Sequence, residues 1–145
     1  MDTVPPNNAL FFCNSLRQVE QAHASAGLMV RAGAAAADWG MSLLRHAELP
    51  ILILAGPGNN GGDALEMASL LRTRNLQVEV VFRGKPEQLP PDAAQAYQHF
   101  IAEGGNTQTS ITPGRNWGLI VDGLFGIGLT RPLDGSYAEL AQAAN

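Results

Sequence analysis

Two asparagines and an aspartate stand inside a glycine-rich segment, and their side chains are well suited to chemistry. The run Gly-Pro-Gly-Asn-Asn-Gly-Gly-Asp occupies residues 56–63 and directly follows the apolar residues 51–55. Amide and carboxyl groups can hydrogen-bond a ligand, carry a proton or bind a hard cation. A buried strand that breaks into glycines and then opens a helix is how α/β proteins build a pocket for a phosphate-bearing ligand. The segment therefore predicts a polar binding pocket.

A second glycine-rich segment begins beside Asp122 and runs over residues 121–135. Asp122 falls at the carboxyl end of a predicted strand, which is the edge of an open α/β sheet where ligands bind. We therefore expect Asn59, Asn60, Asp63 and Asp122 to converge on one pocket. A carboxylate in such a pocket could act as a general acid or base, or it could ligate a cation.

Each of these charged residues also has a purely structural interpretation. Asp63 could cap the helix that follows it, and Asp122 could hydrogen-bond the backbone of its own loop. Arg131 could hold a phosphate or carboxylate, or it could lie in solvent. Two consecutive asparagines and a Gly-Gly pair exceed what a helix cap requires, which favours a binding function for residues 56–63.

Two familiar nucleotide-binding patterns fit the first segment poorly. Residues 56–61 match Gly-x-Gly-x-x-Gly after a strand, but that fingerprint also needs an acidic residue at the end of the second strand. Glu79 is the nearest acidic residue, and it lies in the middle of the predicted strand. Asp63 would compete with a pyrophosphate for the N–H groups at the helix start. The phosphate-binding loop of nucleotide hydrolases is excluded because no Lys-Ser/Thr pair follows the glycines.

The surrounding pattern alternates strands with helices and predicts an α/β fold. We expect strands over residues 51–55, 78–82 and 119–121, and helices over residues 15–24, 28–45, 63–74, 92–103 and 136–144. Ser15 and Ser136 are the predicted caps of the first and last helices. Such an alternation favours a mostly parallel sheet covered on both faces. Residues 1–14 are predicted to be an irregular N-terminal arm, and residues 15–145 a single domain.

Composition excludes several classes of protein. The chain has 145 residues, of which 46% are hydrophobic and 15% charged, and its net charge is −4, so a globular fold without nucleic acid as a partner is expected. No apolar run approaches the roughly 18 residues of a membrane span, and the N-terminus lacks the features of a signal peptide. We therefore expect a soluble, cytoplasmic protein that has no contact with a membrane. The single cysteine cannot form an internal disulfide.

Three segments together resemble the YjeF N-terminal domain family, the NAD(P)H-hydrate epimerases. They are Leu-Met-Val-Arg-Ala-Gly at residues 28–33, the run at 56–63, and Val-Asp-Gly-Leu-Phe-Gly-Ile-Gly-Leu-Thr-Arg-Pro-Leu-Asp-Gly at 121–135. The three occur in the order and with the approximate spacing of that family. The likeness extends over residues 15 to 145.

The resemblance implies a Rossmann-like three-layer αβα sandwich that epimerises the S and R forms of the nicotinamide hydrates NADHX and NADPHX. It implies that Asp122 is the acid/base group and that Asn60 and Asp122 hold a potassium ion as cofactor. The residues that it places against the substrate are Asn59, Asn60, Gly61, Gly62, Asp63, Gly126, Ile127, Gly128, Leu129, Thr130, Arg131 and Pro132.

The chain departs from the family pattern at three places. Ala64 and Val30 replace a glycine and a glutamate that are usual in the family. The family also continues beyond residue 145 with a strand and an Asp-x-Pro-Ser-Gly motif, so the domain is expected to be incomplete at its C-terminal end, either as a fragment of a longer protein or as a chain that has lost the activity. Bacterial members are often fused to an ADP- or ATP-dependent dehydratase, and homodimers are common among them.

Two other functions compete with the epimerase prediction. The domain could be a non-catalytic module of the same fold that binds a nucleotide or mediates dimerisation. It could also be an ordinary Rossmann dehydrogenase, which is disfavoured by Asp63 at the phosphate position and by the poorly placed Glu79.

Overall fold

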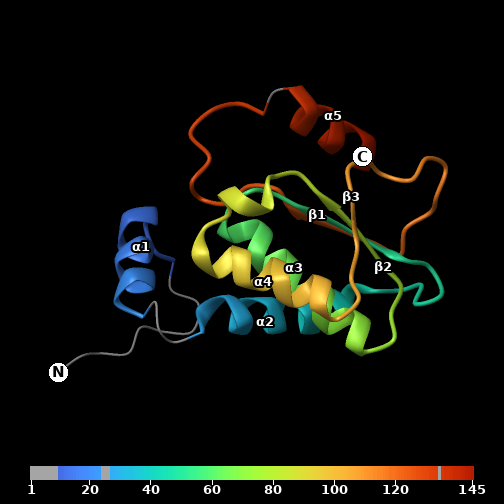
Figure 1. Cartoon of the computed structure of the whole chain (residues 1–145), viewed down its shortest axis with the longest axis horizontal. Helices are drawn as coiled ribbons and strands as arrows, with labels where there is room; N and C mark the ends of the chain where they lie inside the picture. The colour runs from blue at the N-terminus through green and yellow to red at the C-terminus, as the bar shows by residue number, and fades with distance from the viewer. Residues whose placement is uncertain (1–9, 24–26, 134) are drawn as a thin grey trace.

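The protein is an α/β domain in the computed structural model, which describes residues 10–23, 27–133 and 135–145 (Figure 1). The elements follow one another in the order α1 (Cys13–Ala22), α2 (Leu28–Leu43), β1 (Ile51–Ala55), α3 (Asn59–Thr73), β2 (Val78–Phe82), the short 3-10 helix η2 (Pro86–Gln88), α4 (Pro91–Ala102), β3 (Thr107–Gln108), β4 (Leu119–Gly123) and α5 (Gly135–Ala144). The strands predicted over residues 51–55 and 78–82 are confirmed with the same bounds, and the predicted third strand is β4, which extends two residues further.

The four strands form one all-parallel sheet in the order β3-β2-β1-β4. Helices α2, α3 and α4 cover one face and α5 covers the other, so the predicted three-layer αβα sandwich is confirmed (Figure 1). Every residue of β1 is buried, because this strand has a neighbour on each side and helices on both faces. The carboxyl ends of β1, β2 and β4 therefore meet at one edge.

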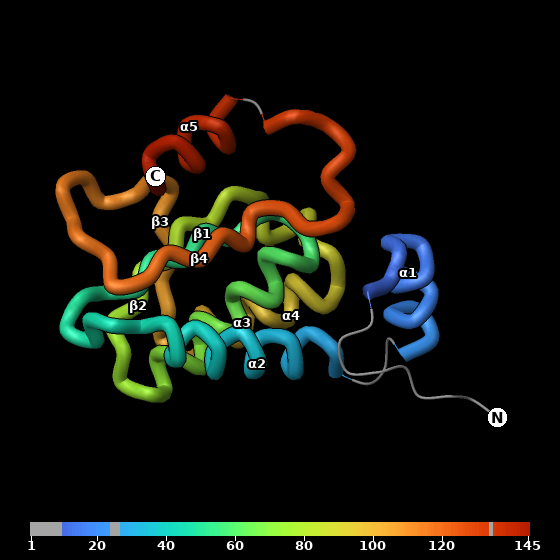
Figure 2. Tube along the Cα trace, turned by 180° about the vertical axis from the view of Figure 1, so that it is seen from behind, coloured from blue at the N-terminus to red at the C-terminus, as the bar shows by residue number. Residues whose placement is uncertain are grey.

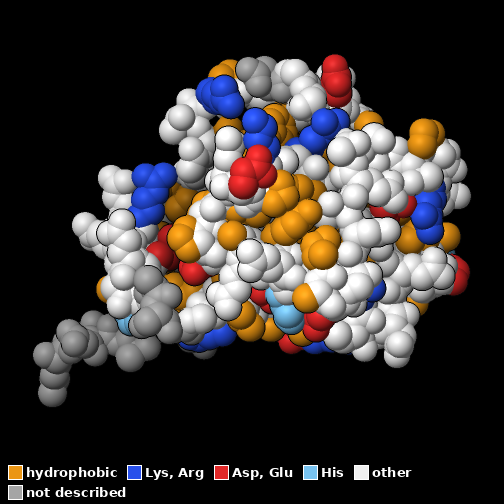
Figure 3. All heavy atoms as spheres, viewed as in Figure 1, with side chains coloured by type: hydrophobic (Ala, Val, Ile, Leu, Met, Phe, Trp, Pro, Cys, Tyr) orange, Lys and Arg blue, Asp and Glu red, His pale blue; other side chains and the backbone are white. Residues whose placement is uncertain are grey.

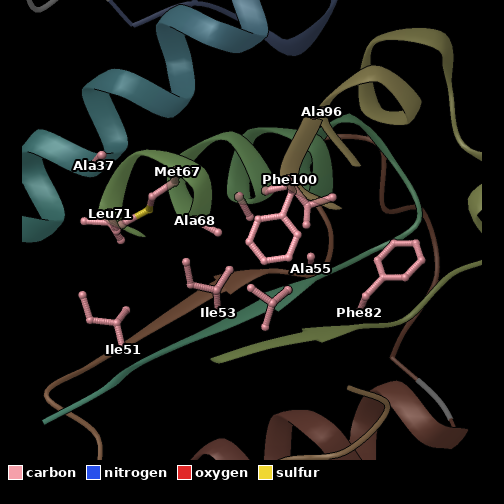
Figure 4. Packing of buried hydrophobic residues seen from close by; sticks show 13 residues of the cluster. Ala37, Ile51, Ile53, Ala55, Met67, Ala68, Leu71, Phe82, Ala96 and Phe100 are labelled. Carbon is pink, nitrogen blue, oxygen red and sulfur yellow. The ribbon is translucent and has the colours of Figure 1, made fainter. Parts of the chain in front are cut away.

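The larger hydrophobic core lies between the sheet and the three helices (Figure 4). Ile51 and Ile53 project from β1 onto this face, where they meet Leu71 of α3 and Phe100 of α4. Leu52 and Leu54 alternate to the other face and pack in a second cluster with Leu140 of α5. Burying one such side chain contributes about 1.5–3 kcal/mol, so this strand anchors both layers.

Helix α3 begins at Asn59, four residues before the predicted start at Asp63. The prediction was wrong because asparagine and glycine are poor helix formers, and tertiary packing overrides that preference here. Gly62 lies against Met29 and Ala93, where a Cβ atom would come within 2.6 Å of the Met29 sulfur. The helical cap is Gly58, so Asp63 lies one turn inside the helix and the capping interpretation of Asp63 is also wrong.

The ends of the chain differ from the prediction in similar ways. Helix α1 begins at Cys13, two residues before the predicted helix start at residue 15, and most of the predicted N-terminal arm, residues 1–9, lies outside the described residues. Ser15 lies inside α1, whose cap Phe12 makes no side-chain hydrogen bond. Ser136 likewise lies inside α5 rather than at its cap.

The buried Glu79 fastens the segment before β4 to β2. Its carboxylate accepts hydrogen bonds from the backbone N–H of Thr112 at 3.2 Å, the Thr112 hydroxyl at 2.8 Å and the Arg115 guanidinium at 3.0 Å. Glu79 pairs with Leu52 in the first half of β2, away from the edge where the strands end. Its partners show that Glu79 is a structural carboxylate and not the ribose ligand of a dinucleotide fingerprint.

The face of the molecule that Figure 3 shows mixes basic, acidic, polar and apolar side chains. In the described part of the chain α2 is the longest helix, with 16 residues. Within that part, no helix has the length and apolar character needed to cross a bilayer.

Candidate functional site

A cavity of about 540 Å³ lies at the edge where the parallel strands end. Three segments wall it: α1, the turn from β1 into α3, and the loop that follows β4. Both views of the backbone place α1 and this loop on the same side of the molecule (Figures 1 and 2). The lining residues are Leu16, Arg17, Glu20, Pro57, Gly58, Asn59, Asn60, Asp63, Leu124, Phe125, Gly126, Ile127, Gly128 and Leu129.

Two of the walls, residues 56–63 and the loop after β4, are bonded directly to each other. The side-chain nitrogen of Asn60 donates to the Phe125 carbonyl at 3.1 Å, and the backbone N–H of Gly56 donates to the Gly123 carbonyl at 3.1 Å. Gly56 must be glycine, because a Cβ atom there would overlap the carbonyl of Leu124. The two glycine-rich segments identified in the sequence are thus brought together, because the strands that precede them are neighbours.

The start of α3 offers unoccupied hydrogen-bond donors to this cavity. Its cap, Gly58, has no side chain that could accept a hydrogen bond from the first N–H groups of the helix. The first N–H groups of a helix have no partner within the helix, so they can bind an anionic or carbonyl group of a ligand. Asn59 and Asn60 add polar side chains to the same wall.

Asp63 is the acidic residue of α3 that faces the cavity. Partial burial, together with the nearby carboxylates of Glu20 and Glu66, raises the pKa of its carboxyl from an ordinary 3.8 to about 6. A carboxyl group with a pKa close to neutral can both give and take a proton under physiological conditions. Asp63 is therefore equipped for acid/base chemistry as well as for binding.

Asp122 has a different environment from the one expected of a residue in the pocket. It is exposed near the end of β4, and its Oδ1 accepts a hydrogen bond from the backbone N–H of Leu124 at 3.0 Å. Val121 packs into the core beside α3, and a Cβ atom on Gly123 would touch Ala64 of α3, so strand alternation directs Asp122 toward the opposite face. Asp122 does not line the cavity.

The other predicted substrate residues divide into two groups. Asn59, Asn60 and Asp63 line the cavity together with residues 126–129 of the loop. Gly61 and Gly62 are buried in the contacts of α3 with the rest of the fold. Thr130, Arg131 and Pro132 are exposed and lie beyond the lining.

Arg17 and Glu20 on α1 also line the cavity, and neither was among the residues predicted from the sequence. Arg17 reaches across the opening, where its Nη2 donates to the Ile127 carbonyl at 3.4 Å. The helical pattern of residues 13–22 indicates which residues share a face, but it carries no information about what that face contacts. The sequence therefore held no signal that α1 closes one side of the site.

The oxygen atoms of Asn60 and Asp122 suit a hard cation such as potassium, which is ligated by carbonyl and carboxylate oxygens. Asn60 donates through its side-chain nitrogen to Phe125, which leaves its amide oxygen as the ligand atom. A Cβ atom on Gly123, the neighbour of Asp122, would lie 3.4 Å from the backbone carbonyl oxygen of Asn60, so the two candidate ligands stand on adjoining segments. Among the described residues, no cluster of three or more His, Cys, Asp or Glu could hold a metal, so such a site would need backbone carbonyls as well.

Comparison with known proteins finds close relatives along most of the chain. A protein of Bordetella pertussis named NAD(P)H-hydrate epimerase is 49% identical over 118 residues, which is 81% of this chain and 51% of the relative. One of the same name from Achromobacter xylosoxidans is 42% identical over 98% of this chain and 67% of its own length. A bifunctional NAD(P)H-hydrate repair enzyme of Thermofilum pendens is 32% identical over 81% of this chain and 24% of the relative.

The chain spans about half the length of the first of these relatives. The family described as YjeF-related protein N-terminus matches residues 25–145, which include both glycine-rich walls of the cavity. The match covers most of the chain, and two of the three segments predicted to carry the likeness, residues 56–63 and 121–135, contribute to the walls of the cavity. The chain therefore belongs to the YjeF-related N-terminal domain family.

Proposed function

We propose that this domain interconverts the R and S hydrates of NADH and NADPH, and so repairs damaged nicotinamide cofactors. The observation that carries the proposal is the meeting of residues 56–63 and the loop after β4 in one polar cavity. The name NAD(P)H-hydrate epimerase, which the Bordetella and Achromobacter relatives bear, supplies the substrate class.

The reaction needs little more than a proton carrier and a pocket. The hydrate has a hydroxyl on the carbon beside the ring nitrogen. When a carboxylic acid protonates this hydroxyl, the C–O bond breaks, water leaves and the nitrogen lone pair forms a planar iminium cation. Water then adds to either face while the carboxylate takes back the proton, which inverts or restores the stereocentre. The cofactor is the substrate, and no oxidation or reduction takes place.

Two carboxyl groups are candidates for the proton carrier. Asp122 is the residue that the family resemblance assigns, and it remains our proposal. Asp63 is the alternative, favoured by its position in the cavity and by a pKa raised to about 6. Either conjugate base would also stabilise the cationic intermediate.

The remaining residues of the cavity would bind and orient the substrate. Asn59 and Asn60 would hydrogen-bond its polar groups, and the glycines of residues 126–129 would let its phosphates approach the backbone. Asn60 and Asp122 would supply oxygen ligands to a potassium ion, which would add a fixed positive charge near a negatively charged substrate. A higher melting temperature in potassium chloride than in choline chloride, reduced in Asn60→Ala, would support this site independently of turnover.

The function is tested by following the R and S hydrates of NADPH, by chromatography or proton NMR, with and without the protein in potassium buffer. We expect the protein to accelerate equilibration of a pure epimer. No acceleration by a folded protein would contradict the proposal. Binding of NADP⁺ without epimerisation would then identify a non-catalytic nucleotide-binding module, and self-association without binding would identify a dimerisation module.

Substitution of the two carboxyls separates their roles. We expect Asp122→Asn to lower kcat at least about 100-fold, which is the usual contribution of general acid/base catalysis, while the fold is retained. Asp63→Asn is the matched comparison, because it removes the other carboxyl. Full activity of Asp122→Asn together with an inactive Asp63→Asn would transfer the acid/base role to Asp63.

A further inference from the structure

The cavity has an uneven distribution of charge. Of the described residues that line it, Arg17 alone has a positively charged side chain, whereas Glu20 and Asp63 are acidic. Basic and acidic side chains lie next to each other over α1 and its boundary with the rest of the molecule (Figure 3). A ligand that carries a diphosphate brings two further negative charges into this space. The carboxylates would repel it unless a cation neutralised part of its charge.

Arg17 lies on the wall of this cavity, within reach of a ligand bound there. Its guanidinium bridges from α1 to the Ile127 carbonyl, in the middle of the glycine loop of residues 126–129. This contact of 3.4 Å is long, so the guanidinium can exchange a neutral carbonyl for a charged acceptor at little cost. Arg17 and Glu20 also line a second cavity of about 590 Å³ between α1 and α2, and Asn59 and Asp63 contribute to the walls of both cavities.

We infer that Arg17 binds the diphosphate of the nucleotide substrate against the glycine loop, and that α1 is the movable wall that carries this arginine to the ligand. The inference rests on the proposed function for the identity of the substrate. A guanidinium suits the role because its planar donors can bind two phosphate oxygens at once. No residue of α1 is buried, so the helix can shift with little loss of packing. Helix α1 also precedes the segment of residues 25–145 that matches the family.

Binding measurements test the inference without relying on turnover. ADP-ribose, which contains the diphosphate but no nicotinamide, is titrated calorimetrically into the full chain, into Arg17→Gln and into the control Arg31→Gln. Arg31 is an exposed arginine of α2 that does not line the cavity. We expect Arg17→Gln to weaken ADP-ribose binding about tenfold or more, as the loss of a charge-assisted contact does, while Arg31→Gln binds normally. Equal affinities of wild type and Arg17→Gln would overturn the inference.

A comparison of ligands excludes a merely structural role for Arg17. If Arg17 only fastened α1 to the loop, Arg17→Gln would weaken every ligand of the cavity, including adenosine, which lacks phosphates. We expect the affinity for adenosine to be unchanged and the loss for ADP-ribose to shrink as salt increases. An equal loss for both ligands would overturn the diphosphate assignment.

Kinetics link the inference to the proposed reaction. We expect Arg17→Gln to raise KM for NADPH hydrate about tenfold and to leave kcat within about twofold, because Arg17 binds a part of the substrate remote from the reacting carbon. A protein that binds ADP-ribose through Arg17 but does not epimerise would refute the proposed function and uphold the assignment of the diphosphate site. An active enzyme whose KM is unaffected by Arg17→Gln would uphold the proposed function and refute the assignment of Arg17 to the diphosphate.

Discussion

Asp63 is placed where its protonation depends on elements that are distant in sequence. Glu20 approaches it from α1 and Glu66 from the next turn of α3, and both act in the same direction as partial burial. Because the charged form of Asp63 is disfavoured, the folded protein retains a proton on it at pH values where the unfolded chain has lost it. The ionised carboxylate of Asp63 therefore destabilises the fold, whereas its protonated form can donate a proton to a ligand in the cavity.

The pKa of Asp63 predicts how stability changes with pH. Because the folded pKa is about 6 and the ordinary value is 3.8, this carboxyl favours the folded state below about pH 4, and that contribution is lost as the pH rises through 6. A fully buried group with this shift would change stability by about 3 kcal/mol, and solvent screening of the partly exposed Asp63 reduces the expected effect to about 1–2 kcal/mol.

We therefore expect Asp63→Asn to gain stability relative to wild type between pH 4.5 and 7.5. Urea unfolding at both pH values measures the difference, and Glu87→Gln, which removes an exposed carboxylate of η2, is the control. An Asp63→Asn stability that follows the wild-type curve at both pH values would show that the carboxyl titrates normally.

At the scale of elements, the turn from β1 into α3 is built by close approach of backbone segments. Gly61 lies so near the Gly56 carbonyl that a Cβ atom would overlap it, and Gly56 in turn leaves no room beside Leu124. These contacts draw the start of α3 and the loop after β4 together, and they explain why the helix begins within a run of asparagines and glycines. Packing, rather than helix propensity, sets this boundary.

We expect Gly61→Ala to destabilise the fold by about 2–4 kcal/mol, because the added methyl group must displace backbone atoms. Gly128→Ala is the matched control: a Cβ atom on Gly128 would have no neighbour within 4 Å. The free energy of unfolding of both variants, from urea denaturation, checks the expectation. A Gly61→Ala variant as stable as Gly128→Ala would show that the backbone of the turn can shift to accept the methyl group at little energetic cost.

At the scale of the whole molecule, the domain consists of a tightly packed sandwich with α1 beside it. The core joins α2, α3 and α4 to the sheet, whereas α1 contributes no buried residue (Figure 1). Stability and ligand binding should therefore be separable. The sandwich supplies the rigidity that holds Asn60 and Asp63, and α1 supplies charge.

Removal of residues 1–26 tests this separation. Because no residue of α1 is buried, we expect the remaining chain to lose no more than about 1 kcal/mol of stability, but to bind ADP-ribose as weakly as Arg17→Gln does. Urea denaturation and calorimetry measure the two quantities. A loss above about 3 kcal/mol would show that α1 is part of the folding unit.

Much of the sandwich could be predicted because burial leaves a clear pattern in β1, which is wholly apolar, and in β2, which is apolar except at Glu79, and the predicted bounds of both strands match the structure. The two-residue strand β3 escaped prediction, since a stretch so short has no periodicity. The meeting of the two glycine-rich segments followed from the rule that parallel strands end at one edge.

The rest of the site depends on information that local sequence does not contain. The direction of Asp122 is set by the register in which β4 pairs with β1, and a shift of one residue would turn its side chain to the other face. The contribution of Arg17 depends on where α1 docks, which no pattern within residues 13–22 encodes. Tertiary placement therefore decides which polar residues can act together.

The parallel pairing of β1 with β4 has a consequence for how the protein forms during its synthesis. The segments Ile51–Ala55 and Leu119–Gly123 are neighbours in the sheet, yet α3, β2, η2, α4 and β3 lie between them in the chain. Closing so long a loop is entropically costly, and such pairings form slowly. One wall of the cavity is therefore absent until β4 has emerged from the ribosome and joined β1. A ligand of this cavity therefore stabilises only the chain in which β4 has joined the sheet, because it cannot bind before that wall has formed.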